Sequence, residues 1–425
     1  MLPLFYLISH YSNLPFRAWE QRKFEDCFNF PVSTNSLSRV MLNYDKGEVK
    51  NVHYGDVLIK YPCILNIKKE EIPYITGGCL EAYNSNLLEN GDLIFADAAE
   101  DETVGKAVEV NGITNENLVS GLHTIVARAT TQKAKYFLGY YINSDIYHRQ
   151  LLRLMQGSKV SAISKGNLQK TDVSFPKDIE EQQKIGSYFK KLDSTIALHQ
   201  RKLDALKLMK KGFLQRMFPN NEEEIPKVRF ADFDGMWKQR KLNSITEKIT
   251  RKNKELESTL PLTISAQDGL IDQNEYFNKI IASRNIRGYF LVKNGEFAYN
   301  KSYSKGYPWG VVKRLDNYNM GVLSTLYIIF KPVKINSDFL TKYFDSTYWY
   351  RAVSQFATEG ARNHGLLNIA ASDFFEIELN IPLNNEEQKK IGLFFQQLEN
   401  IIILHQNKLE KLSILKKTYL KKMFI

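Results

Sequence analysis

The chain is poor in cysteine and lacks any long apolar run. Its 425 residues include only three cysteines, Cys27, Cys63 and Cys79, and none of them belongs to a CxxC or CxxH pair. They therefore predict neither a disulfide framework nor a zinc site, and they fit a reducing cytosol, so we expect a cytoplasmic protein. No stretch approaches the roughly 20 apolar residues that cross a membrane, so we expect no membrane association.

The sequence also lacks the short motifs of the common enzyme classes. It has no GxxxxGK[ST] loop for a nucleoside triphosphate and no GxGxxG after a predicted strand. HExxH, GxSxG and the [ND]PP[YF] run of amino-methyltransferases are absent as well. We therefore expect a binding protein with no catalytic residues and no metal site of its own, with an unfamiliar enzyme as one alternative.

Positive charge is in excess. The chain carries 58 Lys and Arg against 47 Asp and Glu, a formal net charge of +11, and 43% of its residues are hydrophobic. This balance favours a globular protein with a polyanionic partner, although charge also serves solubility. The start, MLPLFYLISHY, lacks a basic n-region and a small-residue cleavage site. We interpret it as a mis-started or poorly determined N-terminus rather than a signal peptide.

One long segment occurs twice in the chain. Pro176–Phe218 and Pro382–Phe424 lie 206 residues apart and agree at 21 of 43 positions without a gap. A repeat of this length predicts two copies of a globular domain followed by a long helix. Each copy begins with Pro and an acidic EEQ turn and ends in a Lys-rich turn, which suits the two ends of a helix dipole.

The apolar residues of the repeat advance by alternating steps of four and three. This spacing of 3.5 residues is typical of a coiled coil. We expect the two helices to pack on each other in antiparallel orientation, although each could instead pack on its own domain or on a partner chain. The predicted interface comprises Ile185, Phe189, Leu192, Ile196, His199, Leu203 and Leu206 in the first copy, and Ile391, Phe395, Leu398, Ile402, His405, Leu409 and Leu412 in the second.

Histidines occupy one equivalent position in each seam. His199 and His405 have no carboxylate or cysteine beside them at the spacing of metal ligands. We interpret them as polar residues that fix the register of the helix pair rather than as ligands.

The globular segments that precede the two helices resemble each other more faintly. Trp19–Lys23 reads WEQRK and Trp237–Lys241 reads WKQRK, and each later contains a Gly-acid turn that opens an apolar strand. These strands are GDLIF at Gly91–Phe95 and GEFAY at Gly295–Tyr299. Strands rich in β-branched and aromatic residues, followed by a late helix, predict α+β domains.

Together, the paired EEQxKIGxxFxxL…LHQxKLxxL…KKxxLxxMF helices, the WxQRK motifs and the GDLIF and GEFAY strands resemble the DNA-specificity subunit of type I restriction–modification systems. The resemblance covers nearly the whole chain except about the first sixteen residues. It implies an α+β fold with two target-recognition domains in a pseudo-two-fold arrangement, separated by a coiled coil of two long antiparallel helices. The implied boundaries are 1–175 for the first recognition domain, 176–218 for a helix, 219–379 for a linker and the second domain, and 380–425 for the last helix.

The same resemblance implies a function and a set of partners. Each recognition domain would read one half of a split, asymmetric DNA sequence, and the helices would set the gap and carry the other subunits. The implied partners are double-stranded DNA, two modification subunits and two restriction subunits. The subunit itself would bind no cofactor, because S-adenosylmethionine, ATP and magnesium belong to the partner subunits. A coiled-coil adaptor without DNA specificity is the alternative.

Candidate DNA-binding residues lie on loops rich in cations, amides, hydroxyls and aromatic rings. Lys and Arg suit phosphate or guanine, Asn suits adenine, and hydroxyls suit the DNA backbone. The loop after Tyr299 and a loop between Gly360 and Gly365 have this composition, although the first could be a solvated loop folded back on the sheet. The candidates in the second domain are Asn300, Lys301, Ser302, Tyr303, Lys305, Tyr307, Trp309, Lys313, Arg314, Arg362, Asn363 and His364.

In the first domain the corresponding loop, Phe95–Lys106, is acidic. Several carboxylates together repel phosphate, so we expect most of this loop to be solvated and only its cationic end to approach DNA. The candidates here are Lys106 together with Lys159 and Lys165 from a later segment. The difference predicts that the two domains read different sequences.

Overall fold

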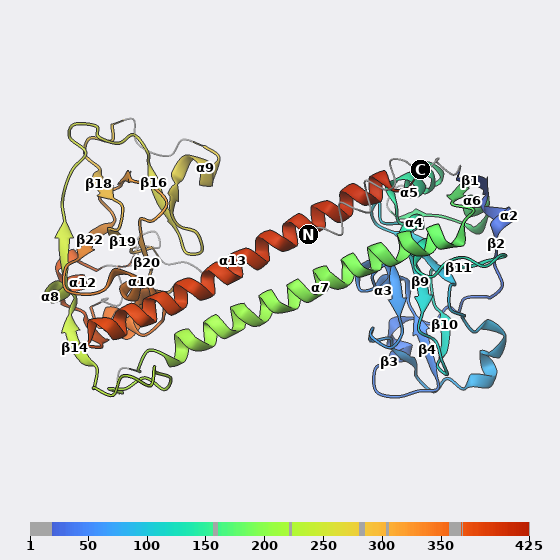
Figure 1. Ribbon diagram of the computed structural model, residues 1–425, viewed down its shortest axis with the longest axis horizontal. Coiled ribbons are helices and arrows are strands. Elements are labelled where there is room, and N and C mark those ends of the chain that lie inside the picture. The colour runs from blue at the N-terminus through green and yellow to red at the C-terminus, as the bar shows by residue number, and fades with distance from the viewer. Residues whose placement is uncertain are drawn as a thin grey trace. The chain divides into compact units, whose positions relative to one another are not determined.

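The computed structural model describes residues 19–155, 160–220, 223–279, 285–302, 306–356, 367 and 369–424. The chain forms two compact units (Figure 1). Unit 1 comprises Met1–Gln200 and Lys408–Ile425, and unit 2 comprises Arg201–Asn407. Each unit therefore contains one sheet-bearing domain and about half of each long helix, so the division between the units falls inside the helices rather than at their ends.

The repeat forms the long helices α7 (Ile179–Arg216) and α13 (Asn385–Lys422), each of 38 residues. Both have two glutamates in the first turn, and basic residues stand in the last turn of each. These charges complement the helix dipole, as the sequence predicted. The helices thus begin and end within a few residues of the repeat.

Within each unit the two helices run antiparallel. In unit 1 the Tyr188 and Tyr419 rings lie 5.6 Å apart, and Asp193 pairs with Lys416. Because the chain number rises on one helix as it falls on the other, the two segments have opposite directions. In unit 2 the counterparts 206 residues away make the same contacts: Phe394 packs on Phe213 at 4.9 Å, and Glu399 pairs with Lys210. The predicted α+β fold with a long antiparallel helix pair is confirmed.

The predicted seam residues are less exposed than most of their neighbours. Phe189 and Phe395 are fully buried, and each belongs to the hydrophobic core of its own unit. The other buried members are Ile185, Leu192, His199, Leu203, Ile391, Leu398 and Ile402, while Ile196, Leu206, His405, Leu409 and Leu412 are half-buried.

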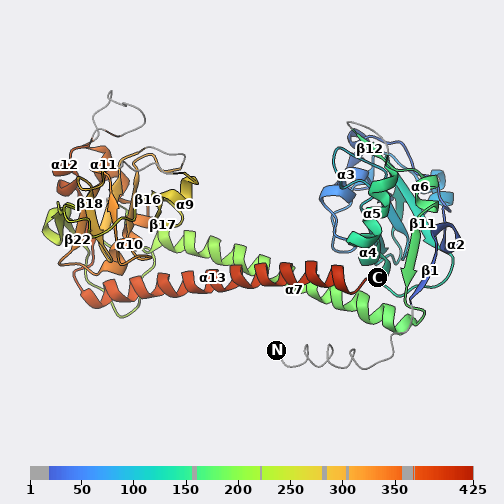
Figure 2. The same cartoon turned by 90° about the horizontal axis from the view of Figure 1, so that it is seen from above.

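In the described part of unit 1, a five-stranded sheet has the order β2-β11-β7-β9-β5, and a four-stranded sheet has the order β10-β4-β6-β3. Figure 2 labels β1, β11 and β12 of this unit. Two-stranded sheets β1-β13 and β8-β12 complete the unit. The strands are β1 (Glu20–Lys23), β2 (Phe28–Asn29), β3 (Leu42–Asn43), β4 (Val49–Val52), β5 (Ile64–Asn66), β6 (Tyr74–Ile75), β7 (Leu93–Ala96), β8 (Ala98–Ala99), β9 (Ala107–Asn111), β10 (Asn117–Ser120), β11 (Thr124–Ala129), β12 (Ser161–Ala162) and β13 (Asp172–Phe175). The shorter helices are α2 (Phe24–Cys27), α3 (Tyr54–Ile59), α4 (Phe137–Ile142), α5 (Asp145–Leu154) and α6 (Lys165–Gln169), with 3-10 turns at Arg39–Met41, Leu80–Ala82 and Asn84–Asn86.

In the described part of unit 2, a four-stranded sheet has the order β15-β22-β19-β20. Smaller sheets pair β14 with β23, β16 with β17 and β18 with β21. The strands are β14 (Lys238–Lys241), β15 (Thr246–Ile249), β16 (Leu262–Ser265), β17 (Gly269–Asp272), β18 (Phe290–Lys293), β19 (Phe297–Asn300), β20 (Val311–Arg314), β21 (Met320–Leu323), β22 (Ile328–Pro332) and β23 (Glu378–Ile381). The shorter helices are α8 (Leu242–Ile245), α9 (Gln273–Phe277), α10 (Ser337–Asp345), α11 (Trp349–Ser354) and α12 (Ala371–Glu376).

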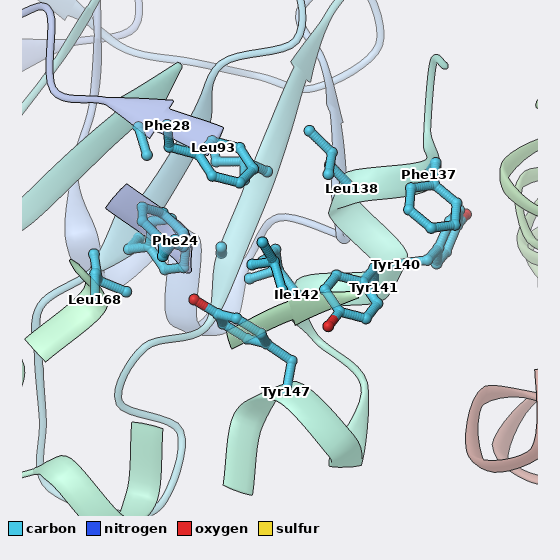
Figure 3. Close-up of a cluster of buried hydrophobic side chains, with 14 of the residues drawn as sticks. Phe24, Phe28, Leu93, Phe137, Leu138, Tyr140, Tyr141, Ile142, Tyr147 and Leu168 are labelled. Atoms are coloured by element: carbon cyan, nitrogen blue, oxygen red, sulfur yellow. The ribbon is translucent and has the colours of Figure 1, made fainter. Parts of the chain in front are cut away.

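The central strand of unit 1 is buried on both faces. Leu93 and Phe95 of β7 join one hydrophobic cluster, whereas Ile94 and Ala96 join another. Successive side chains of a strand point to opposite faces, which explains why β7, with the sequence LIFA, is apolar throughout rather than alternating. Figure 3 shows part of the first cluster, where labelled side chains from α2, β7, α4 and α5 gather.

A glycine lets each domain approach its long helix closely. A Cβ on Gly186 of α7 would lie 2.7 Å from the Lys135 carbonyl oxygen, and one on Gly392 of α13 would lie 2.7 Å from the Asp338 Cβ. Both distances are below van der Waals contact, so only glycine permits this packing. A glutamine four residues earlier fixes the same junction: Gln182 accepts from the Ala134 N–H, and Gln388 accepts from the Asn336 N–H.

We expect Gly186→Ala to lower the free energy of unfolding by about 1–3 kcal/mol, because the added methyl group must displace the backbone beside it. The matched control is Gly212→Ala on the same helix, where nothing lies within 4 Å of the added Cβ. That change should stabilise the protein by up to about 1 kcal/mol through helix propensity. Chemical denaturation of both variants checks the prediction, and equal effects at the two sites would contradict it.

Candidate nucleic-acid interface

The first candidate loop of unit 2 connects β19 to β20. Tyr299, at the end of β19, is fully buried, donates its hydroxyl to the Trp309 carbonyl oxygen at 2.8 Å and stacks on Phe374 at 4.4 Å. Gly310 has φ +80°, and a Cβ there would overlap the Asn300 carbonyl oxygen. The loop is therefore anchored at both ends by contacts that require these residue types.

The second candidate loop returns beside the first. The Leu367 N–H donates to the Lys301 carbonyl oxygen at 2.9 Å, and the Lys301 Nζ donates to the Ile369 carbonyl oxygen at 3.1 Å. The two loops thus lie side by side where they join the folded domain, although they are about 60 residues apart in the sequence. Tyr303, Lys305, Arg362, Asn363, His364 and, in the first domain, Lys159 lie outside the described residues.

Unit 1 repeats this arrangement. The Ile163 N–H donates to the Asp97 carbonyl oxygen at 2.8 Å, and both residues lie 204 positions before Leu367 and Lys301. Pairing of β8 with β12 extends the contact. The two candidate segments of the first domain therefore also lie together, with Asp97 where the second domain has Lys301.

Several candidate cations make contacts within the protein. Lys313 pairs with Asp345 at 2.7 Å, and Arg314 pairs with Asp316 at 2.6 Å and Asp338 at 2.8 Å. These groups are already neutralised, so they are less available to phosphate than their residue type suggests. As DNA contacts they stay predictions.

The two candidate cations of unit 1 that the structure describes differ in exposure. The Lys106 Nζ donates to the carbonyl oxygens of Leu58 at 2.9 Å and Tyr61 at 3.1 Å, and burial lowers the pKa of this amine. Lys165 is exposed at the start of α6, with its Nζ 5.4 Å from the centre of the Phe30 ring.

The remaining candidates of unit 2 that the structure describes are half-buried, so their polar groups are only partly accessible. They are Asn300, Ser302, Tyr307 and Trp309.

The structure also places a histidine beside the first-domain loop that sequence reasoning missed. The His123 Nδ1 lies 3.2 Å from an Asp97 carboxylate oxygen, and the Tyr54 ring meets the imidazole edge-on at 5.3 Å. Burial raises the pKa of Asp97. His123 is half exposed and has a left-handed φ of +54°, which is uncommon for a residue other than glycine. The sequence shows His123 in the tripeptide Gly121–His123, but its partners Asp97 and Tyr54 lie far away in the sequence, so no local pattern connects them.

Equivalent strand positions hold the domain helices by different polar groups, an acidic one in unit 1 and a basic one in unit 2. Glu109 of β9 accepts from the N–H groups of Tyr136 at 2.6 Å and Gly139 at 2.8 Å, at the start of α4. Its counterpart in register, Arg314 of β20, instead reaches Asp338 in the first turn of α10. Burial raises the pKa of Glu109 to about 7, even though the two N–H groups favour its ionised form.

The first part of the chain matches a known family in sequence. The family described as "Type I restriction modification DNA specificity domain" matches residues 18–208. The comparison with curated proteins gave no significant match. Residues 18–208 are therefore similar in sequence to this family of DNA-specificity domains, which agrees with the resemblance stated from the sequence.

Solved structures share the fold over nearly the whole chain. The S subunit of a type I restriction–modification system from M. genitalium aligns with a TM-score of 0.56 and 13% identity, covering 97% of this chain and 98% of its own. A second solved structure, from work on complex assembly and conformational transition of the type I R-M system, aligns with a TM-score of 0.50 and 15% identity. The alignment covers 96% of this chain and 98% of that one. Within the described residues, no helix is long and apolar enough to cross a bilayer.

The buried carboxyl of Glu109 makes the stability of unit 1 depend on pH. Its folded pKa of about 7 exceeds the ordinary 4.5, so the folded state keeps a proton that the unfolded state has released. The contribution of this group to stability should fall as pH rises between those values. We expect Glu109→Gln to flatten the decline in the free energy of unfolding between about pH 5 and about pH 8. Parallel denaturation curves at the two pH values test this, and an identical decline in both proteins would contradict it.

Proposed function

We propose that the chain is the non-catalytic recognition subunit of a type I restriction–modification complex, and that each domain reads one half of a split DNA target. One observation carries the proposal. Both domains hold two loops together by the same backbone hydrogen bond, yet place different side chains there, Asp97 and His123 in one and Lys301 in the other. A common scaffold with different polar groups at its loops is what two different half-sites require.

The charge and the helices support the remaining partners. A net charge of +11 favours association with the polyanionic DNA duplex. The duplicated helix offers equivalent surfaces twice, which supports binding of two modification subunits, accompanied by two restriction subunits. S-adenosylmethionine, ATP and magnesium would then be bound by those partners, because the sequence contains none of the motifs that hold them.

The test of this function is the pattern of adenine methylation in cells that carry the subunit and its modification partner. Wild-type protein should direct methylation to one bipartite sequence. Exchanging residues 237–379 for those of a sibling subunit should change one half-site and leave the other unchanged. The matched control is the reciprocal exchange of the first domain, which should change only the other half-site. Methylation without sequence preference would favour the adaptor alternative, and a change in both half-sites would contradict independent reading.

The helices should act as the ruler between the half-sites. Four residues inserted after Leu206 lengthen a helix by about 6 Å, or nearly two base pairs, and rotate the rest of the helix by roughly 40°. We expect such a variant to methylate a target with a wider gap or none at all. The same insertion after Asn115, in an exposed turn before β10, serves as the control and should leave the gap unchanged. Full activity of the helix variant on the original target would rule out the ruler.

A further inference from the structure

A half-buried carboxylate joins the domain of unit 2 to both long helices. Glu399 of α13 accepts from the Nζ of Lys210 on α7 at 2.6 Å. Both of its oxygens also accept from the Nζ of Lys342 on α10, each at 2.7 Å. The side chain of Lys342 is only 9% exposed, so water screens this pair weakly. Three elements thus meet at one carboxylate.

The ion pairs continue to the base of a candidate DNA-reading loop. Lys342 also lies 3.5 Å from Asp345 at the end of α10, and Asp345 pairs with Lys313 at 2.7 Å. Lys313 belongs to β20, the strand that follows the candidate loop between β19 and β20. Burial opposes ionisation of Asp345, but Lys313 and Lys342 outweigh it and hold the pKa of this carboxyl below its usual range. Asp345 therefore stays ionised at neutral pH.

Unit 1 has a counterpart at the same repeat position. Asp193, 206 residues before Glu399, accepts from Lys416 of the opposite helix at 2.5 Å and from the Tyr140 hydroxyl of α4 at 2.8 Å. Tyr140 takes the place of Lys342, so the domain-side contact is a hydrogen bond rather than an ion pair. A carboxylate that links both helices to the domain is thus found in both halves of the chain.

The hydrophobic contacts at this junction do not fix an orientation by themselves. Phe339 of α10 lies in the same buried cluster as Phe395 of α13. Apolar burial depends on area and has little directional preference, whereas charge-assisted hydrogen bonds of defined geometry resist rotation and sliding. The ion-pair chain, together with the hydrogen bond between Gln388 and the Asn336 N–H, can set an angle at this junction.

We propose that Glu399, Lys342 and Asp345 are positioning residues that fix the orientation of the second recognition domain on its helix segments, and thereby select the gap at which its half-site is read. This inference rests on the proposed function. It assigns the choice of gap to the junction as well as to helix length, while the bases themselves are read by the loops.

The experiment uses the complete complex with its modification subunits and duplexes that carry the mapped target with its native gap or one base pair more or less. Lys342→Met removes one cation, but Glu399 keeps Lys210 and Asp345 keeps Lys313, so no buried charge is left alone. We expect the ratio of methylation rates on native and altered gaps to fall about fivefold to tenfold, as in other coupled networks. Base preference within each half-site should not change.

Three further variants sharpen the test. Glu399→Gln should reduce the ratio similarly, and the double variant should be little worse than Glu399→Gln alone, because that change already breaks the link between Lys342 and Glu399. The control is Lys389→Met, which breaks an exposed pair with Glu386 at 2.7 Å on the same helix. It should leave the ratio at the wild-type value.

An unchanged ratio in both Lys342→Met and Glu399→Gln, at unfolding temperatures near that of wild type, would overturn the proposal. So would additive effects of the two changes, or an equal effect of Lys389→Met. Failure of the proposed function is a separate result, because wild-type complex would then methylate without any sequence preference and no gap ratio would exist.

Discussion

The packing of a phenylalanine of one long helix on a phenylalanine just past the end of the other is the interaction on which both units depend. In unit 1 Phe189 stacks on Phe424 at 5.6 Å, and in unit 2 Phe395 stacks on Phe218 at 6.2 Å. These pairs are the same two repeat positions with the helices exchanged. Each pair lies in the core of its unit together with the domain helix, so helix pairing and domain packing form one apolar cluster and not two. Loss of either phenylalanine removes support from both at once.

The duplicated scaffold separates what holds the domains from what the loops present. Aromatic residues, the junction glycine and the glutamine beside it occur in both halves and make the same contacts. Charged groups at equivalent strand positions differ, as Glu109 and Arg314 show, and still hold the start of the same helix. Apolar packing needs only shape and volume, whereas a polar contact can be replaced by another with the opposite sign if both partners change. The polar groups at the loops can therefore differ between the two domains without changing the architecture.

The sequence predicted the local and repetitive parts well. The helix bounds follow from a 3.5-residue spacing and from the charges at both ends, and the buried strands follow from short apolar runs after a Gly-acid turn. It was less informative about single side chains. Lys313 and Arg314 are of residue types that are common in DNA-binding sites. Their ion-pair partners, Asp345 and Asp338, belong to a helix more than twenty residues further along the chain. No spacing rule connects them, because the contact depends on how α10 lies on the sheet.

The amino-acid sequence by itself determined the duplication, the long helices, the α+β character of the domains and the resemblance to DNA-specificity subunits, since all of these are written in periodicity or in contiguous motifs. Only the tertiary structure decided which polar groups meet. It brought His123 to Asp97, joined Leu367 to Lys301, and connected Lys313 through Asp345 and Lys342 to Glu399. The physical reason is that these contacts bring together residues distant in the chain, and their geometry exists only once the apolar cores have fixed the angles between sheets and helices.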